Sequence, residues 1–274
     1  MDKSIQVGKI NNLKINRVSE PGIYLISEDE TEVLLPNAYV TKEMQIDQDL
    51  EVFIYTDSED RLVATTLKPY VYLDEFAFLE IVDVAKFGYF VDIGLPKDIL
   101  VPKNRQKGIF HEGSRIVLQL QIDEKTDRLI ASQKFELDKN VVGLKRNDEV
   151  DILVYSKTPL GFKVIINNKF EGLIFHNEIF SKISIGDRKK AYIKNIRPDG
   201  KADIVLQKIG EKVKNDTVLE ILEDNGGKLN FTYKSSAEDI NEVFGISKKS
   251  FKATLTKLLA EDKIILDEDS IRVK

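Results

Sequence analysis

Aromatic and basic residues are interleaved in two parts of this chain. Phe87, Tyr89 and Phe90 surround a glycine, and a second group of rings and cations follows after residue 160. Aromatic rings can stack on the bases of a single strand, while lysine and arginine side chains can hold its phosphate backbone. These residue types therefore favour a site for single-stranded nucleic acid. The candidate contact residues are Phe87, Tyr89, Phe90, Lys103, Arg128, Phe162, Lys163, Phe175, His176, Lys189, Lys190, Lys194 and Arg197.

The same residues also admit a purely structural interpretation. Alternation along a strand places Phe87 and Phe90 on opposite faces, so both rings reach the surface only if the strand is bulged at Gly88. Without that bulge, one of the two rings belongs to the core. Arg128 is either a phosphate contact or an ordinary exposed arginine in a turn. The rings of the second group are likewise either surface rings or barrel core.

Catalytic and metal-binding groups are scarce in this sequence. The chain has two histidines, His111 and His176, and no cysteine, which leaves few nucleophiles or metal ligands. It contains no glycine-rich phosphate-binding loop of the P-loop kind, and its carboxylates are scattered along predicted turns. We therefore expect no enzyme, no cofactor and no metal, and a nuclease is the only catalytic class worth testing.

The elements that must position these residues repeat along the chain. Two phrases of the first repeat return in the second, at lags of 66 and 67 residues: VLLPN at 33–37 with ILVPK at 99–103, and DRLVAT at 60–65 with DRLIAS at 127–132. A weaker third copy consists of GLIFHN at 172–177 and PDGK at 198–201. Self-similarity at a fixed lag indicates repeated domains, and this lag suits one small barrel per repeat.

Each repeat is predicted to form five short strands. In the second repeat we expect them over residues 79–84, 87–93, 99–102, 115–123 and 128–132. Apolar residues alternate along the fourth of these strands, and the polar run that follows it predicts a hairpin turn. Five short strands in about 65 residues, with Gly and Pro at the corners, fit a small closed β-barrel of the OB type.

The C-terminal segment changes period, and its apolar residues fall at helical spacing. We expect a first helix that passes through Leu222 and stops at Gly226. Ser236 and Ser247 are the expected N-caps of a second and a third helix. Residues 263–273 then predict a β-hairpin. Three helices closed by a hairpin indicate a winged helix-turn-helix.

Basic residues decorate the third predicted helix, which in helix-turn-helix folds usually enters a DNA groove. Lys248, Lys249 and Lys252 are therefore candidate contacts to nucleic acid or to a protein partner. Exposed lysines are also common on helices without such a role, and the expected wing tip at residues 267–269 is acidic. We expect a supporting nucleic-acid contact or protein docking there, in preference to sequence-specific DNA binding.

Charge is distributed unevenly along the chain. The net charge of −5 divides into −6 for residues 1–68, −2 for 69–140, +5 for 141–210 and −2 for 211–274. On long-range electrostatics, a polyanion would prefer the third repeat, although a solvated surface of mixed charge gives a similar balance. The first repeat should repel phosphates. We expect it to be a scaffold or a partner-binding module.

The second repeat resembles a known RNA-binding domain. Residues 87–92, the strand at 100–102 and the hairpin at 127–129 are similar to the domain of the ribosomal S-one type. In that type the stacking rings flank the glycine, and the matching residues here are Phe87 and Phe90. The usual motif also places a histidine after the third strand. The second repeat has Pro102 at that position, and the third has Phe175 there, with His176 one position later.

The whole chain resembles the conserved virulence factor B family, in which three such domains precede a winged helix. Residues 234–240 and 242–252 are similar to the most recognisable stretch of that family. The resemblance is weakest in the first repeat. It implies a cytoplasmic bacterial RNA-binding protein that is linked in some pathogens to the expression of virulence factors and is not known as an enzyme.

We therefore expect mainly β structure with an α+β C-terminal domain. The predicted domains are a divergent S-one-like OB domain at 1–68, S-one-type OB domains at 69–138 and 139–210, and a winged helix at 211–274. We expect a monomer that binds single-stranded RNA weakly through several modules and that has no membrane partner. The alternatives are a transcription regulator that binds DNA through the winged helix, and a protein-docking adaptor. Apolar residues in the linkers 67–75 and 135–147 indicate packing between domains.

Overall fold

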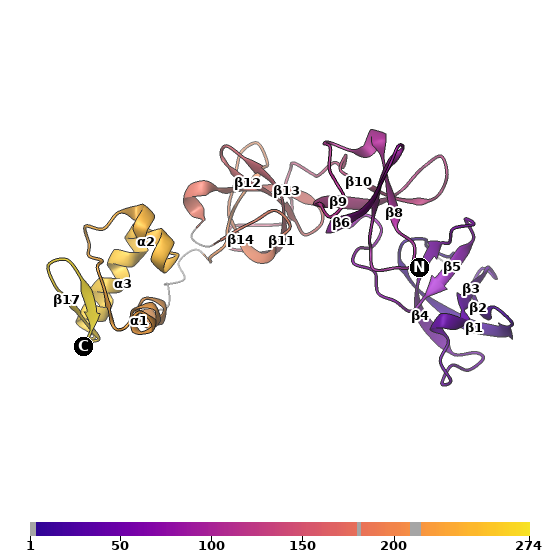
Figure 1. The fold of residues 1–274 in the computed structure, drawn as a ribbon, viewed down its shortest axis with the longest axis horizontal. Helices are drawn as coiled ribbons and strands as arrows, with labels where there is room; N and C mark the ends of the chain where they lie inside the picture. Colours follow the sequence, from indigo (N-terminus) through magenta and orange to yellow (C-terminus); the bar gives the residue numbers. More distant parts are fainter. Residues whose placement is uncertain (1–3, 180–181, 209–214) are drawn as a thin grey trace. The chain divides into compact units, whose positions relative to one another are not determined.

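The computed structural model describes residues 4–179, 182–208 and 215–274. The chain divides into two compact units, Met1–Leu137 and Asp138–Lys274. The first unit holds two five-stranded barrels, and the second holds a third barrel followed by a helical domain. The chain colours of Figure 1 follow this order along the sequence. This architecture confirms the predicted fold class.

The first barrel consists of β1 Ile10–Ser19, β2 Gly22–Ile26, β3 Glu32–Pro36, β4 Asp49–Thr56 and β5 Leu62–Thr65. These strands close in the order β1-β2-β3-β5-β4. Along β1, Leu13 and Ile15 enter the core while Lys14 between them is exposed. The two-residue period of the strand thus buries one face and leaves the other to solvent.

The second barrel consists of β6 Phe76–Ala85, β7 Gly88–Val91, β8 Ile99–Pro102, β9 Arg115–Ile122 and β10 Leu129–Ser132, in the sheet order β10-β9-β6-β7-β8. Phe53, Tyr55 and Val63 of the first barrel belong to the same apolar cluster as the core of the second. Val71, in the segment that connects the barrels, is buried in this cluster too. The first linker therefore packs between the two barrels, as its apolar residues indicated.

The third barrel consists of β11 Glu149–Thr158, β12 Gly161–Ile166, β13 Phe170–Phe175, β14 Arg188–Ile196 and β15 Ala202–Val205. It closes in the same order as the first, β11-β12-β13-β15-β14. Its core contains Val154, Val164 and Ile174, all of which are fully buried. Val141, from the segment before β11, is buried in the same core.

The sequence repeats correspond to repeated strand pairings. In each barrel the second strand begins with a glycine that faces the last residue of the third strand: Gly22 faces Pro36, Gly88 faces Pro102, and Gly161 faces Phe175. A short 3-10 helix follows each of these third strands: η1 Asn37–Tyr39, η2 Lys103–Arg105 and η3 His176–Glu178. Equivalent positions of the three sequence repeats therefore lie on equivalent strands of the three barrels.

A bulge at Gly88 was the condition under which both rings would reach the surface, but the register shift lies in the facing strand. The pairing of β6 with β7 shifts register between Ile81 and Asp83, and the long strand β6 pairs with β9 up to Glu80 and with β7 from Ile81 onward. Gly88 meets a different constraint. A Cβ atom at this position would lie 2.3 Å from the carbonyl oxygen of Val101, so only glycine allows the strands this close.

The C-terminal domain consists of α1 Asn215–Asp224, β16 Lys228–Leu229, α2 Ala237–Phe244, α3 Lys248–Ala260, β17 Ile264–Leu266 and β18 Ile271–Val273. Ser236 caps α2 by accepting a hydrogen bond from the Asp239 amide at 3.0 Å, and Ser247 caps α3 in the same way. Gly245 ends α2 with a φ of 63°. The predicted winged-helix elements are therefore present. Among the described residues, no helix is long and apolar enough to span a bilayer.

Candidate nucleic-acid interface

A cleft of about 510 Å³ opens on the second barrel, over strands β7 and β8. Its walls come from the turn before β7, the loop between β7 and β8, η2, the hairpin between β9 and β10, and the end of β4. The lining residues are Tyr55, Thr56, Phe87, Phe90, Lys97, Asp98, Ile99, Leu100, Pro102, Asn104, Arg105, Asp123, Lys125, Thr126, Arg128, Leu129 and Ile130. In OB-folds, nucleic acid binds on this strand face and the loops beside it.

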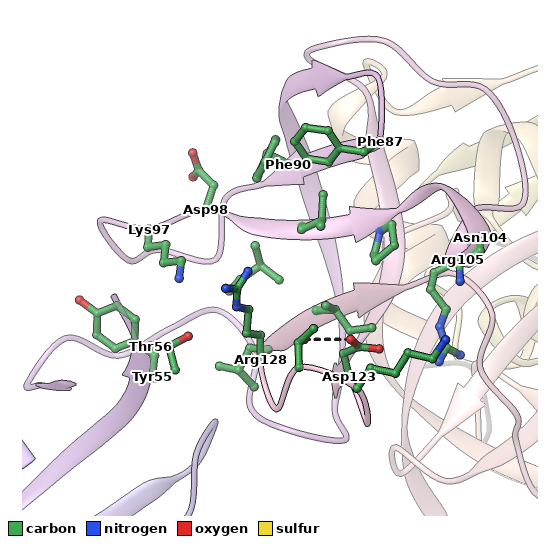
Figure 2. Close-up of a pocket in the computed structure, with 17 residues that line it drawn as sticks. Tyr55, Thr56, Phe87, Phe90, Lys97, Asp98, Asn104, Arg105, Asp123 and Arg128 are labelled. Carbon is green, nitrogen blue, oxygen red and sulfur yellow. Dashed lines mark hydrogen bonds between the residues drawn. The ribbon is translucent and has the colours of Figure 1, made fainter. Parts of the chain in front are cut away.

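Two phenylalanine rings stand together in this cleft. The Phe87 side chain is 59% exposed, and its ring centroid lies 5.8 Å from that of Phe90, nearly at a right angle. Alternation along β7 turns Tyr89 and Val91 inward and Phe90 outward, while Phe87 lies just before the strand begins. Figure 2 shows both rings at one side of the cleft, with Arg128 on the opposite side. Both rings are accessible to a ligand.

Tyr89, which the sequence named as a contact, lies in the core. Its side chain is buried among the apolar residues of the second barrel. The hydroxyl donates a hydrogen bond to the Gly108 oxygen at 3.3 Å and accepts one from the Phe110 amide at 3.0 Å. The hydroxyl therefore ties β7 to the loop after η2, and the ring is not available to stack on a base.

Cations reach the cleft from three different loops. Arg128 forms an ion pair with Asp60 of the first barrel. Lys97 donates a hydrogen bond to the backbone oxygen of Asp57 at 2.6 Å, and burial lowers its pKa. Arg105 and Lys125 also line the cleft. The predicted contact Lys103 is exposed on η2 but lies outside the lining.

A carboxylate also lies near the rings. Asp98 lines the cleft in the loop before β8, where Figure 2 places it beside Phe90. Burial raises the pKa of Asp98, and the neighbouring charges of Asp92 and Asp83 raise it further. The cleft thus combines accessible rings with charges of both signs, which can contact bases as well as phosphates.

The corresponding face of the third barrel carries a smaller cleft of about 210 Å³. Lys163 and Arg197 line it, but each is engaged by an acid: Lys163 lies 3.2 Å from Glu171, and Arg197 lies 2.6 Å from Asp203. The Arg197 guanidinium also lies 5.4 Å from the centre of the half-buried Phe175 ring. Ring and cation therefore meet here, but none of the described residues that line the cleft is aromatic.

Two other predicted contacts of the third barrel have structural roles. Phe162 is buried in the barrel core and is therefore not a surface ring. The ring of His176 packs at 5.8 Å against Phe162, and its Nε2 lies 3.1 Å from the Thr158 carbonyl oxygen. A carbonyl can only accept, so Nε2 carries the hydrogen in this contact.

The lysines of β14 lie away from the smaller cleft. Lys189 forms an ion pair with Asp187 at 3.7 Å, Lys190 with Asp151 at 2.9 Å, and Lys194 with Glu178. None of the three lysines lines the cleft that contains Lys163 and Arg197. These three lysines are therefore not gathered in one groove with Phe175 and Arg197.

On the winged helix, the candidate lysines occupy the start of α3. Lys249 and Lys252 are exposed, and Lys248 donates to the backbone oxygen of Lys234 at 3.4 Å. The opposite side of α3 packs into the domain core through Phe251 and Leu255. Amphipathic spacing therefore keeps the lysine side of the helix accessible.

Lys97, Arg105 and Lys125 belong to the site although the sequence alone did not indicate them. Lys97 and Lys125 lie in turns and Arg105 ends η2, and in the sequence all three belong to ordinary polar connections between strands. The repeats were the signal that could have identified these residues. Their register places two connections around the strand face of β7 and β8: the hairpin between β9 and β10, and η2 after β8. Among residues 4–179, 182–208 and 215–274, no group of three or more His, Asp or Glu side chains could hold a metal ion.

Two family models match parts of this chain. Residues 7–67 match the model described as S1 domain, and residues 216–273 match the model described as CvfB-like winged helix domain. The S1 match falls on the first barrel, the repeat whose sequence shows the weakest resemblance to the S-one type. Both matches are to domains of a nucleic-acid-binding type, and neither is to an enzyme family.

Several known proteins are similar to the chain along nearly its whole length. YitL of Bacillus subtilis is 27% identical over 276 residues, which cover 96% of this chain and 92% of that protein. Conserved virulence factor B of Staphylococcus epidermidis is 24% identical over 285 residues, covering 99% and 95%. A solved Streptococcus pneumoniae structure, described as a multidomain protein with nucleic acid binding domains, is 24% identical over 98% of both chains with a TM-score of 0.46. The family models and the relatives confirm the predicted resemblance to conserved virulence factor B.

Proposed function

We propose that this protein binds single-stranded RNA and that the cleft of the second barrel is its principal binding site. The pair of accessible rings, Phe87 and Phe90, is the observation that carries the proposal. Each base has a flat face that can stack on such a ring, whatever its identity. Binding by stacking would therefore tolerate many sequences and would require bases that are not paired in a duplex.

The position of the cations supports the same proposal. Arg105, Lys125 and Arg128 line the cleft around the rings, so a strand whose bases stack on Phe87 would carry its phosphates past these side chains. Charge-assisted hydrogen bonds from lysine and arginine would hold the backbone and make binding sensitive to salt. The rings supply the preference for single strands, and the cations supply affinity without sequence preference.

The third barrel is a second, weaker contact in this proposal. It combines Phe175 with Arg197 and Lys163, and its segment carries the highest positive charge of the chain. Phosphate groups would have to replace the carboxylates of Asp203 and Glu171 at these cations. We expect this exchange to make binding by the third barrel weaker and less dependent on salt than binding by the second.

We also propose a role for this protein in gene expression. Relatives that are similar along nearly the whole chain carry the name conserved virulence factor B, so we propose a post-transcriptional regulator in the bacterial cytoplasm that acts as a monomer and is not an enzyme. DNA binding through the winged helix is the second candidate, since Lys249 and Lys252 are exposed on α3. The acidic wing tip at 267–269 argues against close approach to a duplex.

Fluorescence-anisotropy titration of labelled single-stranded RNA, single-stranded DNA and duplex DNA at two salt concentrations tests the proposal. We expect Phe87→Ala to weaken RNA binding by about tenfold, on the scale of one lost stacking contact. Ile109→Ala is the control, because this side chain is 89% exposed in the same unit but outside the cleft. A Lys189/Lys190/Lys194→Ala triple variant measures the contribution of β14.

The outcomes separate the candidate functions. Salt-sensitive binding to single-stranded RNA that Phe87→Ala weakens and Ile109→Ala preserves would support the ring cleft. Binding to duplex DNA alone, lost when Lys249 and Lys252 are replaced, would transfer the function to the winged helix. If none of the three nucleic acids binds, the proposal is wrong and a protein-docking adaptor becomes the better account.

A further inference from the structure

One turn of the first barrel reaches the cleft of the second. This turn, residues 57–61, joins β4 to β5, and the residues just before it, Tyr55 and Thr56, line the cleft. It makes two polar contacts across the barrel boundary. Asp60 forms an ion pair with Arg128, and the backbone oxygen of Asp57 accepts a hydrogen bond from Lys97 at 2.6 Å. Both cationic partners belong to the cleft lining.

The turn holds the Asp60 carboxylate in a defined place. The Asp57 carboxylate accepts hydrogen bonds from the amides of Glu59 at 2.9 Å and of Arg61 at 3.0 Å. The guanidinium of Arg61 binds the same carboxylate at 2.7 Å. Asp60 itself has a φ of 63°, a left-handed conformation that aspartate and asparagine tolerate better than most residues. The backbone that carries Asp60 is therefore fixed by its own hydrogen bonds.

The contact with Arg128 is accessible to a competing anion. The Arg128 side chain is 52% exposed and that of Asp60 is 42% exposed. A carboxylate and a phosphate bind the same guanidinium donors, so the two cannot occupy the same face of Arg128 at once. Ion pairs this exposed contribute little to stability, which makes the exchange of one anion for the other inexpensive.

We propose that Asp60 competes with RNA phosphate for Arg128, so that the first barrel limits the affinity of the binding site on the second. The proposal rests on the proposed function of the cleft. It gives the acidic first barrel a defined part in binding: its turn completes the wall of the cleft and keeps the cation occupied until a phosphate displaces the carboxylate. Asp60 is thus an affinity-determining residue that does not itself contact the ligand.

The test is a set of anisotropy titrations with single-stranded RNA on the full chain. Asp60→Asn removes the charge while keeping a residue that tolerates the left-handed backbone. We expect RNA affinity to rise about two- to fivefold, the scale of an exposed ion pair, and the salt dependence to steepen by about the equivalent of one phosphate contact. Asp60→Glu, which keeps the carboxylate, should bind like the wild type.

Glu59→Gln provides the matched control. It makes the same change of charge one residue away, but Glu59 forms its ion pair with Arg61, at 2.8 Å, rather than with a cation of the cleft. We expect it to change affinity by much less than Asp60→Asn. Arg128→Ala is then measured in both backgrounds. It should weaken binding more in Asp60→Asn than in the wild type, because only there is the guanidinium free for phosphate.

The inference is overturned if Asp60→Asn binds RNA no more tightly than the wild type, or if Arg128→Ala has equal effects in both backgrounds. Weaker binding by Asp60→Asn would show instead that the carboxylate orients Arg128 toward the ligand. Phe87→Ala separates this failure from failure of the proposed function. If Phe87→Ala weakens binding while Asp60→Asn changes nothing, only the proposed competition is wrong. If neither the wild type nor any variant binds RNA, both proposals are wrong.

Discussion

One repeat position carries different chemistry in the three barrels. Two residues after the first glycine of the second strand lie Tyr24, Phe90 and Lys163. The Arg17 guanidinium covers the Tyr24 ring at 3.7 Å, and Lys163 is engaged by Glu171. Phe90 instead stands beside the exposed ring of Phe87. The second barrel is therefore the one whose residue at this position belongs to an accessible pair of rings.

A partly buried carboxylate organises the same face of the third barrel. Glu171 accepts a hydrogen bond from the Tyr155 hydroxyl at 2.5 Å and lies 3.2 Å from Lys163. Burial by itself would raise the pKa of Glu171, but the hydrogen bonds from Tyr155 and Lys163 and the charge of Lys163 lower it below its ordinary value. Burial also raises the pKa of the Tyr155 hydroxyl, which keeps it a donor.

We predict that Glu171→Gln destabilises the third barrel by about 1–2 kcal/mol at neutral pH, the scale of a charge-assisted hydrogen bond. A carboxyl group with a depressed folded pKa stabilises the fold above its unfolded pKa of about 4.3, and this stability is lost as pH falls through the folded pKa. The difference in unfolding free energy between wild type and variant should therefore shrink in acid. Urea unfolding between pH 7 and pH 3 measures it.

Glu149→Gln is the control for that prediction. Glu149 also accepts from a tyrosine, Tyr192 at 3.1 Å, and pairs with a lysine, but its side chain is 51% exposed against 24% for Glu171. Solvent screens exposed pairs, so its loss should cost well under 1 kcal/mol. Equal effects of the two substitutions would contradict the role assigned to burial.

At the scale of elements, the barrels depend on a close approach between the second and third strands. Gly161 begins β12 with a φ of 155°, and a Cβ atom there would lie 1.9 Å from the carbonyl oxygen of Ile174. Gly22 occupies the same position in the first barrel, with the same φ and a distance of 2.1 Å to the Leu35 oxygen. The glycine is thus required by strand pairing in both closed barrels.

We predict that Gly161→Ala destabilises the third barrel by about 3 kcal/mol, because the methyl group would clash with backbone and the conformation would be strained. Gly143→Ala is a matched control, since it also has a positive φ, 77°, but its Cβ would meet nothing within 4 Å. It should cost about 1 kcal/mol, from strain alone. Thermal unfolding compares the two, and equal losses would show that the close approach is not what matters.

At the scale of the whole molecule, candidate contacts are divided between two units. The ring cleft lies in Met1–Leu137, and the smaller cleft of the third barrel lies in Asp138–Lys274. Linked sites that engage one strand together gain affinity from effective concentration. The gain requires a strand long enough to reach both sites.

We predict that RNA of about 30 nucleotides binds at least tenfold more tightly than RNA of about 8 nucleotides, since one OB-fold covers about 4–16 nucleotides. The comparison is made by anisotropy at constant salt, with affinity expressed per possible binding register. In Arg197→Ala, which removes a cation of the third barrel, the advantage of the longer strand should decrease. An unchanged length dependence in that variant would show that the third barrel does not share the strand.

Local patterns determined much of this protein. The repeated phrases gave three barrels because strand alternation and turn residues act over a few positions and do not depend on distant parts of the chain. Ser236 and Ser247 marked two helix starts for the same reason, since a cap acts within one turn. The motif named Phe87 and Phe90 as candidate rings but left open whether both reach the surface, and the register shift near them lies in β6 and not at Gly88.

Only the tertiary structure decided which charges meet. Folding of the second barrel brings Lys97, Arg105 and Lys125 around one strand face from three separate connections. Packing of the first barrel against the second then sets Asp60 on Arg128, 68 positions away. The sequence carries no local signal for such contacts, because they depend on how strands close and barrels pack. Net charge favoured the third repeat as the phosphate-binding site, because a count of charges does not show which of them are paired. In the structure, its lysines on β14 are paired with acids away from the cleft.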